Sequence, residues 1–382
     1  MHSPHLIFAL TADVQYNSRA LKQLQALCEL GFSIDVIFFT RLQTFLSLPP
    51  LPVRWHQLPI PSGRGPRFFY AIHRSLSNYL QQLPPADFYH ASDLYVLPAL
   101  AHHTRIHQAF LTYDARERYP YVFATRNRPW VQKFWFYLEK HFIQKAHAVF
   151  TVSEGLAKHL EADYAITSPV VLPNIPTYQS PPESTSCLRD HLAISPDEPV
   201  FLHQGVLKPG RNAHRLLQAM QQVPQGVLVF MGEGPELPHL KALTQKLKLS
   251  HKVHFIPPVL PEALLSWTAS ADVGITLLED TCLNHRVALP NKLFEYLMAG
   301  LPVLASHLPE ISQIVASFQV GLTVPPSDVQ SIANALNQLS NPVVRHQLKQ
   351  NIPAVLEQYR WEKYIPAFKD CFRQLASTKI KT

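Results

Sequence analysis

The residues best suited to chemistry in this chain lie in one stretch, Leu289–Ser306, which reads LPNKLFEYLMAGLPVLAS. A loop leads into a helical pattern over Leu293–Ala299. Gly300 ends that helix, and an apolar strand over Pro302–Ala305 follows. The stretch therefore predicts a loop, a short helix and a buried strand in quick succession.

Asn291 and Lys292 stand in the loop before this helix. A helix that begins in such a loop presents unpaired backbone N–H groups and the positive end of its dipole, which suit an anionic phosphate. Glu295 is expected in the first turn, where a carboxylate reaches a ribose hydroxyl, and its stabilisation by the helix dipole as an ordinary N-terminal glutamate is a compatible interpretation. Together these residues favour a nucleotide site.

Two further features fit a phosphate ligand. Gly232 and Gly234 form a Gly-x-Gly turn between an apolar run and a helical pattern, although such a turn is weak evidence alone. Arg211 offers a guanidinium that grips a diphosphate through two bonds. The alternative for Arg211 is a solvated arginine in a loop.

The stretch Leu289–Ser306 closely resembles the donor-binding signature of family 4 glycosyltransferases of the GT-B fold. Further runs match that family in place and order, and they cover nearly the whole chain. These runs are Leu111–Pro120 (similar to a "YDSHE" segment), Phe150–Leu160, Val170–Pro176, Phe201–Met220, Val227–Val259 and Leu264–Asp280.

The resemblance implies an α/β fold of the GT-B type, with two Rossmann-like domains facing each other across a cleft. It implies a retaining transfer from a nucleotide-diphosphate sugar to an acceptor hydroxyl, with no obligatory metal and no other cofactor. The residues it assigns to catalysis are Arg211, Lys208, Asp114 and Arg116. Those it assigns to the donor are Gly205, Gly232, Gly234, Asn291, Lys292 and Glu295, and those on the acceptor side are Asn17, Ser18 and Arg19.

The chain departs from the family pattern at several of these positions. Val287 stands where many members place a glutamate that meets the donor sugar, and Val206 stands where many place an arginine, for which Lys208 is a substitute. A histidine of the "YDSHE" pattern is replaced by Arg116, so a structural pair of Asp114 with Arg116 is as good an interpretation as an acceptor site. The family's glycine-rich loop is absent around Asn17–Arg19, where Ser18 or Asn17 is expected to cap a helix and Arg19 to reach an anion.

Composition limits the function classes. The 382 residues are 47% hydrophobic and 16% charged, which predicts a globular chain of two or three domains. Four scattered cysteines, without a CxxC pair or a His cluster of metal-ligand spacing, favour a reducing, cytoplasmic setting and no metal site. The net charge of +7 fits phosphate-bearing ligands or an anionic membrane surface, and no nucleic-acid-binding module accompanies it.

Short apolar strands alternate with helical patterns, which predicts parallel βαβ units. We expect an N-terminal acceptor domain over residues 1–172, a proline-rich linker over 173–199 and a donor domain over 200–360. A last helix, about 361–382, is expected to cross back to the first domain. The proline-rich segment Pro49–Pro66 is expected to be an exposed connection.

The segment Glu117–Phe142 mixes arginines and lysines with aromatic side chains. Such a mixture suits a membrane interface, although a buried helix face explains many of the aromatics. No secretory signal is visible and no apolar run is long enough to span a bilayer. We therefore expect a soluble or peripheral protein on the inner face of the plasma membrane, acting on a glycan or lipid-linked acceptor.

Two other functions remain open at this point. One is a GT-B nucleotide-sugar epimerase that needs no acceptor. The other is a non-enzymatic protein that binds a sugar or lipid and has a decayed donor site, which Val287 and Val206 would support. The sequence leaves the sugar, the nucleotide base, the acceptor and the anomeric linkage open.

Overall fold

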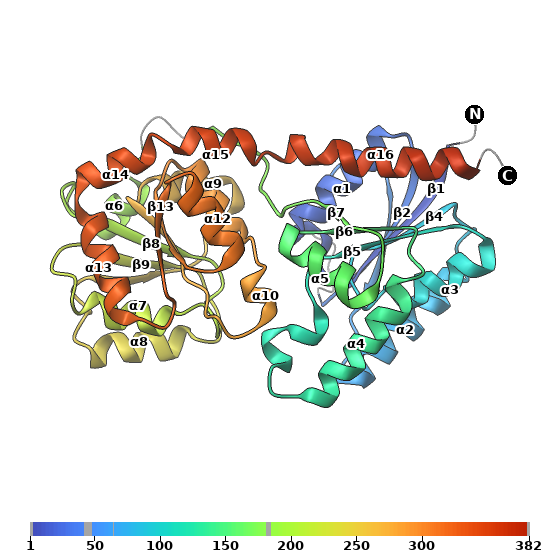
Figure 1. The fold of residues 1–382 in the computed structure, drawn as a ribbon, viewed down its shortest axis with the longest axis horizontal. Coiled ribbons are helices and arrows are strands. Elements are labelled where there is room, and N and C mark those ends of the chain that lie inside the picture. Colours follow the sequence, from blue (N-terminus) through green and yellow to red (C-terminus); the bar gives the residue numbers. More distant parts are fainter. Residues whose placement is uncertain (1–2, 42–47, 64, 181–184, 380–382) are drawn as a thin grey trace. The chain divides into compact units, whose positions relative to one another are not determined.

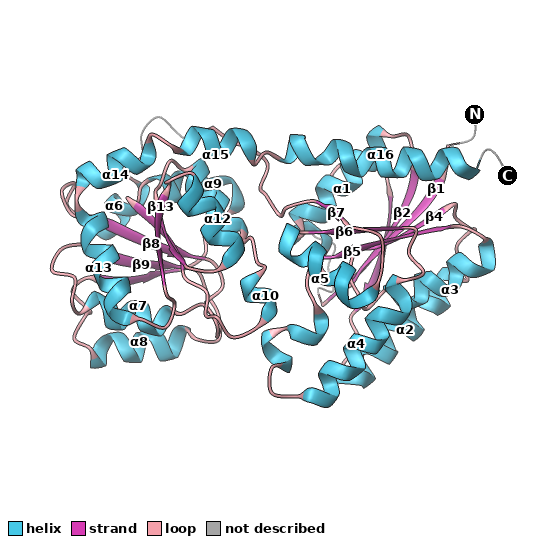
Figure 2. Cartoon of the chain, viewed as in Figure 1, coloured by secondary structure: helices cyan, strands magenta, loops and turns pink. Residues whose placement is uncertain are grey.

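A computed structural model describes residues 3–41, 48–63, 65–180 and 185–379 of the chain. The chain divides into two compact units (Figure 1). Unit 1 contains Met1–Pro173 and Glu362–Thr382, and unit 2 contains Asn174–Trp361. In each unit a sheet lies between helices on both of its faces (Figure 2), as the alternating pattern of the sequence predicts.

The sheet of unit 1 has seven parallel strands in the order β3-β2-β1-β4-β5-β6-β7. The strand order reverses direction between β1 and β4, which is where open α/β sheets bind ligands at their carboxyl ends. The strands are β1 (His5–Leu10), β2 (Ser33–Thr40), β3 (Arg54–Pro59), β4 (Phe88–Ala91), β5 (Phe110–Ala115), β6 (Ala148–Thr151) and β7 (Val170–Val171).

Helices cover both faces of this sheet. Tyr113 of β5 bonds to α4, whereas its neighbour Asp114 bonds to α1, so α4 and α1 lie on opposite faces. Helices α2 and α3 lie on the α4 face (Figure 1). The helices of unit 1 are α1 (Ser18–Glu29), α2 (Gly65–Leu80), α3 (Leu97–His107), α4 (Pro129–Ile143), α5 (Glu154–Tyr164) and α16 (Trp361–Lys379), with short 3₁₀ turns η1 (Val14–Tyr16), η2 (Tyr119–Tyr121) and η3 (Phe123–Thr125).

The expectation of an exposed connection over Pro49–Pro66 is wrong for its middle part. Arg54–Pro59 forms β3, which pairs with β2 from Asp35↔Arg54 to Thr40↔Pro59. Prolines are tolerated there because β3 is an edge strand and one of its sides needs no backbone partner.

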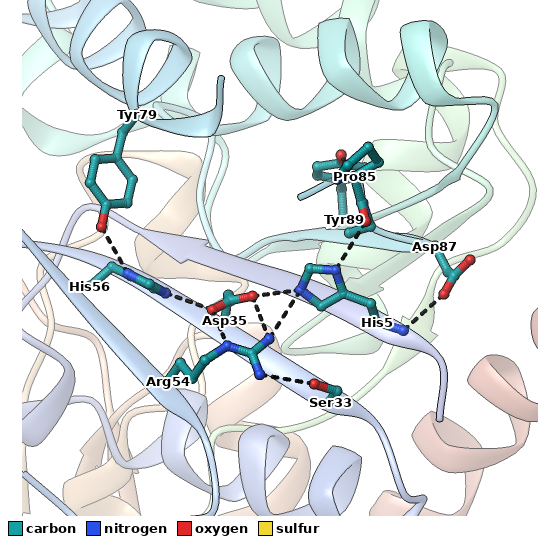
Figure 3. Close-up of polar contacts among 10 residues, drawn as sticks. His5, Ser33, Asp35, Arg54, His56, Tyr79, Pro85, Asp87 and Tyr89 are labelled. Atoms are coloured by element: carbon teal, nitrogen blue, oxygen red, sulfur yellow. Dashed lines mark hydrogen bonds and ion pairs between the residues drawn. The ribbon is translucent and has the colours of Figure 1, made fainter. Parts of the chain in front are cut away.

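Polar side chains join the first three strands at their amino ends (Figure 3). The buried Asp35 carboxylate of β2 accepts bonds from Arg54 Nε and Nη2, each at 2.7 Å, and lies 2.5 Å from His5 Nε2 and 2.6 Å from His56 Nε2. His56 in turn lies 2.8 Å from the hydroxyl of Tyr79 on α2. This network lies at the edge of the sheet opposite to the carboxyl ends of the strands.

The C-terminal helix α16 packs into the core of unit 1. The Phe372 ring packs against Phe32, Phe88 and Phe150, with ring centroids 5.8 to 6.0 Å apart, and the Phe368 ring centroid lies 4.8 Å from that of Phe150. Both α16 phenylalanines are fully buried. The last helix of the chain therefore completes the first unit. None of the described helices is long and apolar enough to cross a membrane.

Unit 2 has a six-stranded parallel sheet in the order β10-β9-β8-β11-β12-β13, which reverses direction between β8 and β11. Its strands are β8 (Val200–Gln204), β9 (Val227–Met231), β10 (Val253–Ile256), β11 (Val273–Thr276), β12 (Val303–Ser306) and β13 (Gly321–Val324). Its helices are α6 (Cys187–Leu192), α7 (Ala213–Met220), α8 (Leu237–Lys246), α9 (Pro261–Ala269), α10 (Leu283–Arg286), α11 (Asn291–Met298), α12 (Pro309–Ser317), α13 (Val329–Ser340), α14 (Pro342–Lys349) and α15 (Ile352–Gln358).

The segment expected to be a linker contains part of unit 2. Helix α6 is attached to it by the Leu188 N–H, which donates to Ser270 Oγ at 3.0 Å, and by the ion pair of Arg189 with Asp272 at 2.5 Å. Residues 181–184 of that segment lie outside the described residues. The prolines of this segment did not reveal the short helix that follows them.

Candidate functional site

A pocket of about 670 Å³ opens in unit 2 where β8 and β9 end. Strand β8 is the strand beside which the sheet order reverses, so the pocket occupies the position at which parallel α/β sheets bind ligands. The residues around it come from the ends of β8 and β9 and the loops after them, from the β10–α9 loop and α9, from α11 and the two residues before it, and from the first residue of unit 2. Its lining is Asn174, Gln204, Gly205, Val206, Lys208, Arg211, Met231, Gly232, Glu233, Pro258, Val259, Leu264, Leu289, Pro290, Asn291, Lys292 and Glu295.

The structure brings most of the expected donor-side residues together in this pocket. Seven of them line it, although they come from three separate parts of the chain: Gly205, Lys208, Arg211, Gly232, Asn291, Lys292 and Glu295. Gly234 does not line the pocket, and its place is in the packing of the loops. The neighbouring loops meet here because the strands that precede them are adjacent and parallel.

Glycine is required in the β9–α8 turn because two backbones touch there. A Cβ at Gly232 would lie 2.2 Å from the carbonyl oxygen of Gly205, and one at Gly234 would lie 2.2 Å from that of Leu207. Both glycines also have positive φ, +147° and +156°, which residues with a side chain rarely adopt. The Gly-x-Gly turn thus lets the β8–α7 loop, with Lys208 and Arg211, lie directly against β9.

Positive charge gathers in the pocket wall. Burial lowers the pKa of Arg211, and burial together with the charge of Arg211 lowers the pKa of Lys292 to about 7. Lys292 Nζ lies 3.4 Å from His203 Nε2. Burial, with Lys292 and Arg211 nearby, holds the pKa of His203 well below its ordinary value, so this imidazole is neutral at neutral pH. Glu295 offsets part of this effect at Lys292, and cations that lose water in this way favour an anionic ligand.

Glu295 is held in place by an amide relay. Gln204 Nε2 donates to Glu295 Oε2 at 2.6 Å, and Gln204 Oε1 accepts from Thr268 Oγ1 at 2.9 Å. Burial raises the pKa of Glu295, against the effects of the Gln204 bond and of Lys292. The relay fixes which oxygen of the carboxylate remains for a ligand.

The position of Glu295 in its helix differs from the expectation. Helix α11 begins at Asn291, two residues earlier than predicted, so Glu295 lies in the second turn and the first turn holds no acid. The helix has no side-chain N-cap, and its first residues, Asn291 and Lys292, line the pocket directly. The apolar period alone placed the start too late because the first two residues are polar.

Helix α11 is locked to the sheet by Tyr296. Its hydroxyl accepts from the backbone N–H of Gln204 at 2.9 Å and donates to the carbonyl of Ile275 at 3.2 Å. A Cβ at Gly274 would lie 2.1 Å from the Tyr296 ring, so the small residue in β11 makes room for it. This anchor sets the distance between α11 and the end of β8.

Sequence reasoning missed four of the polar residues at this site: His203, Gln204, Thr268 and Tyr296. A signal for two of them was present, because β8 ends in His203 and Gln204 after three apolar residues, and polar side chains at the carboxyl end of a buried parallel strand face the ligand edge. Thr268 and Tyr296 carry no such signal, since their partners lie elsewhere in the sequence.

Two of the departures from the family pattern, Val206 and Val287, lie in different surroundings. Val206 lines the pocket and is 60% exposed, and Lys208 lines the same wall. Val287 is buried after α10 and is not among the lining residues.

The expected acceptor-side residues of unit 1 form a buried ion pair. Arg19 of α1 donates to both oxygens of Asp114 through Nε and Nη2, each at 2.7 Å, and Gln23 Nε2 donates to Asp114 Oδ2 at 3.1 Å. Asp114 and Arg19 are both buried. The structure thus corrects the expectation of a strand-end carboxylate facing a cleft, because the carboxylate faces α1. The anion that Arg19 reaches is Asp114 itself.

Arg116 follows β5 and is partly exposed. The direct ion pair of Asp114 is with Arg19, and the charge of Arg116 also acts on Asp114. Against the effect of burial, Arg116 helps Arg19 to lower the pKa of Asp114, and Asp114 raises the pKa of Arg116. Asn17 is the helix cap, since its side chain accepts from the backbone N–H of Ala20 at 3.1 Å, and Ser18 is the first residue of α1. Within the part of the chain that the structure describes, no group of three or more His, Cys, Asp or Glu is placed to hold a metal.

Comparisons with known proteins follow this geometry. The family model described as "Glycosyl transferases group 1" matches residues 186–355, and the model described as "Glycosyl transferase 4-like domain" matches residues 16–174. A relative in Corynebacterium urealyticum, D-inositol 3-phosphate glycosyltransferase, is 30% identical over 247 residues, which are 59% of this chain and 54% of that protein. The chain spans about half the length of the curated relatives it matches.

Two solved structures have a similar fold over their whole length. A sucrose-phosphate synthase from Thermosynechococcus elongatus superposes with a TM-score of 0.79 at 18% identity, covering 98% of this chain and 100% of the other. HepE from Anabaena, solved with UDP and glucose, gives a TM-score of 0.72 at 15% identity over 99% and 100%. The two matched domains, their order and this fold show that the chain belongs to the glycosyltransferases of the family 4 type with the GT-B fold.

Proposed function

We propose that this chain is a retaining glycosyltransferase that moves a hexosyl group from a nucleotide-diphosphate sugar to an acceptor hydroxyl. The observation that carries the proposal is the pocket of unit 2. It brings together three cationic side chains, Lys208, Arg211 and Lys292, and the carboxylate of Glu295 on α11, which an amide of Gln204 at the end of β8 holds in place. A nucleoside diphosphate presents the complementary groups, a polyanion and a pair of ribose hydroxyls.

The cations have a chemical task in such a transfer. When the bond from the anomeric carbon to the diphosphate breaks, negative charge grows on the leaving oxygen. Arg211 is suited to bind the diphosphate through two parallel bonds, and Lys208 and Lys292 add charge in a partly dry site, where it acts strongly. Interactions that strengthen as this charge grows lower the barrier.

Glu295 and the glycines serve to orient the donor. The relay from Thr268 through Gln204 leaves one oxygen of Glu295 to accept from ribose hydroxyls. Gly205 has a φ of +102° and no atom within 4 Å of the place where a Cβ would lie, so its backbone is open to a ligand. UDP in the complex of HepE supports a nucleoside diphosphate as the ligand class.

Retention of the anomeric configuration and independence from metal ions rest on the family resemblance. No cofactor beyond the donor sugar belongs to the proposal. Activity that disappears with EDTA and returns with manganese or magnesium would contradict this part. The curated relative named above is called a glycosyltransferase, which favours transfer over the epimerase and the non-enzymatic alternative.

The acceptor is proposed to bind in unit 1. Arg116, partly exposed at the end of β5, is the acceptor-side residue, and the Arg19–Asp114 pair and the Asn17 cap hold that strand end and the start of α1. Relatives named for D-inositol 3-phosphate support an acceptor hydroxyl. We propose a glycan or lipid-linked acceptor met at the cytoplasmic face of a membrane.

The test begins with donor binding. UDP-, GDP- and ADP-sugars are screened for thermal stabilisation, where a ligand at 100 times its dissociation constant adds about 2.7 kcal/mol to the free energy of unfolding. The donor that binds is then incubated with candidate acceptors, and NMR of the product reads the anomeric configuration. A well-folded protein that no nucleotide sugar stabilises would overturn the proposal, and an inverted product would overturn retention alone.

A further inference from the structure

One outer surface of unit 1 combines exposed aromatic rings with cations. On α4 the exposed side chains Trp130, Phe134, Tyr137 and His141 recur at helical spacing and form one stripe. Trp130 is 80% exposed and Tyr137 is 66% exposed. A group of large aromatic rings exposed to water is more often an interaction site than a surface without a binding role.

Helix α2 extends this surface. The rings of Phe69 on α2 and Phe134 on α4 have centroids 6.1 Å apart, which sets the two helices side by side. The outward residues of α2 are again cationic and aromatic, with Arg67, Tyr70 and Arg74 all exposed. We call this surface the aromatic–cationic face and define it by nine exposed side chains: Arg67, Tyr70, Arg74, Arg126, Arg128, Trp130, Lys133, Phe134 and Tyr137.

The helices that form this face carry mainly positive charge, and Glu117, in the segment after β5, is an exposed acid close to it. The sequences of α2, α3 and α4 contain a single acid, Glu139, and its side chain is buried, bonded to Tyr113 and Tyr164. A groove of about 940 Å³ beside the face, between α2, α3 and the end of α4, also lacks Asp and Glu. Its polar lining includes His73, His102, Arg105, Lys145 and His147.

Cations and rings are also paired with each other. Lys133 Nζ lies 5.2 Å from the centroid of the Trp130 ring, and the guanidinium of Arg126 lies 4.2 Å from that of Phe123. Such pairs place positive charge at the level of the aromatic rings. This is the arrangement of bilayer interfaces, where rings enter the headgroup layer and Lys and Arg meet anionic headgroups.

We propose that the aromatic–cationic face binds the surface of a bilayer that contains anionic phospholipids. Trp130, Phe134, Tyr137 and Tyr70 enter the headgroup region, while the lysine and arginines contact lipid phosphates. A second copy of this chain fits less well, because a symmetric contact through this face would bring like charges together. The proposal goes beyond sugar transfer, since surface binding needs neither donor nor acceptor.

The test is co-sedimentation of the whole chain with vesicles of phosphatidylcholine, with and without phosphatidylglycerol. The wild type is expected to sediment only with the anionic vesicles and to be released by salt. Two charge-reversal pairs probe the face, Arg67→Glu with Arg74→Glu on α2 and Arg128→Glu with Lys133→Glu on α4. A matched pair on α8, Lys241→Glu with Lys246→Glu, makes the same change in net charge on exposed residues of unit 2.

Each pair on the face is expected to lower vesicle affinity about 30-fold or more, because a cation near an anionic surface contributes about fivefold, and the α8 pair is expected to have little effect. Brominated lipids are expected to quench tryptophan fluorescence in the wild type and much less in Trp130→Phe. Each variant is also checked for nucleotide binding by unit 2, which is expected to be unchanged. A fold defect or a failure of the proposed donor site is thereby distinguished from a failure of this inference.

Three outcomes would overturn the proposal. One is no sedimentation of the folded wild type at low salt. Another is an equal loss in the α8 pair, which would mean that net charge alone drives binding. The third is a concentration-dependent dimer, without vesicle binding, that Trp130→Ala with Tyr137→Ala dissociates, which would assign the face to a second copy of the chain.

Discussion

The roles of Arg211 and Glu295 can be separated by the choice of ligand. Arg211→Ala is expected to weaken the binding of both UDP and inorganic pyrophosphate by about 2 to 4 kcal/mol, because a charge-assisted contact is lost in a partly dry site. Glu295→Gln is expected to lower the affinity for UDP about tenfold and to leave the affinity for pyrophosphate almost unchanged, because pyrophosphate has no ribose. Calorimetric titration of both ligands measures the difference.

Arg215→Ala is the matched control, since Arg215 lies on α7, shortly after the loop that holds Arg211, and does not line the pocket. Its nucleotide affinity is expected to equal that of the wild type. Equal losses of affinity for UDP and pyrophosphate in Glu295→Gln would show that Glu295 does not bind the ribose.

Lys292 makes nucleotide binding depend on pH. Its pKa is lowered to about 7 by burial and by Arg211, so a fraction of the free protein carries a neutral amine at neutral pH. A bound diphosphate favours the charged form and raises this pKa, so binding takes up a proton and strengthens as pH falls from about 9 towards 6.

Calorimetry at pH 8 in two buffers of different ionisation enthalpy counts the proton taken up. Lys292→Gln is expected to abolish both the proton uptake and the change of affinity with pH over this range. Proton uptake that persists in this variant would assign the titration to another group.

At the scale of elements, the Asp35 network predicts how the stability of unit 1 varies with pH (Figure 3). Bonds from His5, Arg54 and His56 hold the pKa of Asp35 well below its usual value, against the effect of burial, and the bond to Asp35 raises the pKa of His5. Asp35 adds to the free energy of unfolding at pH values above its unfolded pKa of about 3.9, and this addition is lost as the pH falls from there through its lower folded pKa. His5 makes its whole addition at pH values below about 6.5, and this addition is lost as the pH rises through its higher folded pKa. Stability from this network is therefore greatest between about pH 4 and 6.5.

Asp35→Asn is expected to lower the free energy of unfolding by about 3 kcal/mol at pH 6, because the cations around it lose a buried carboxylate. Arg54 keeps part of its hydration, since its side chain is 57% exposed. The expected loss of stability therefore lies at the lower end of the range for broken buried ion pairs. Urea unfolding from pH 5 to 9 measures both effects. In His5→Gln the decline of stability above pH 6.5 should be smaller than in the wild type, and an unchanged profile would remove His5 from the explanation.

At the scale of the whole molecule, the end of the chain supports its beginning. Phe372→Ala is expected to destabilise unit 1 by about 3 to 5 kcal/mol, because it leaves a cavity among Phe32, Phe88 and Phe150. Calorimetric scans with and without UDP identify the transition of unit 2 as the one that the ligand raises. Phe372→Ala should lower the midpoint temperature of the other transition only. A lower midpoint for the ligand-sensitive transition would contradict this account.

The repeated elements of the fold were largely predictable. The strand expected over Pro302–Ala305 is β12, Val303–Ser306, and it was placed within one residue because buried parallel strands are short apolar runs between turn signals. Strand β3 was missed because its prolines and polar residues hide an edge strand, and α6 was missed because it follows a run of prolines. Gly205, Arg211, Lys292 and Glu295 were assigned to one site because each belongs to a local motif, and the structure places all four around one pocket.

The sequence by itself determined the order of the elements, the glycine turn and the cationic loops, since these depend on the conformational preferences of neighbouring residues. Only the tertiary structure decided which polar groups meet. Arg19 pairs with Asp114 across 95 positions, and Gln204 reaches Glu295 across 91. The physical reason is that a buried charge must find a partner within about 3 Å, and the order of strands in the sheet, not their order in the chain, determines which partner lies that close.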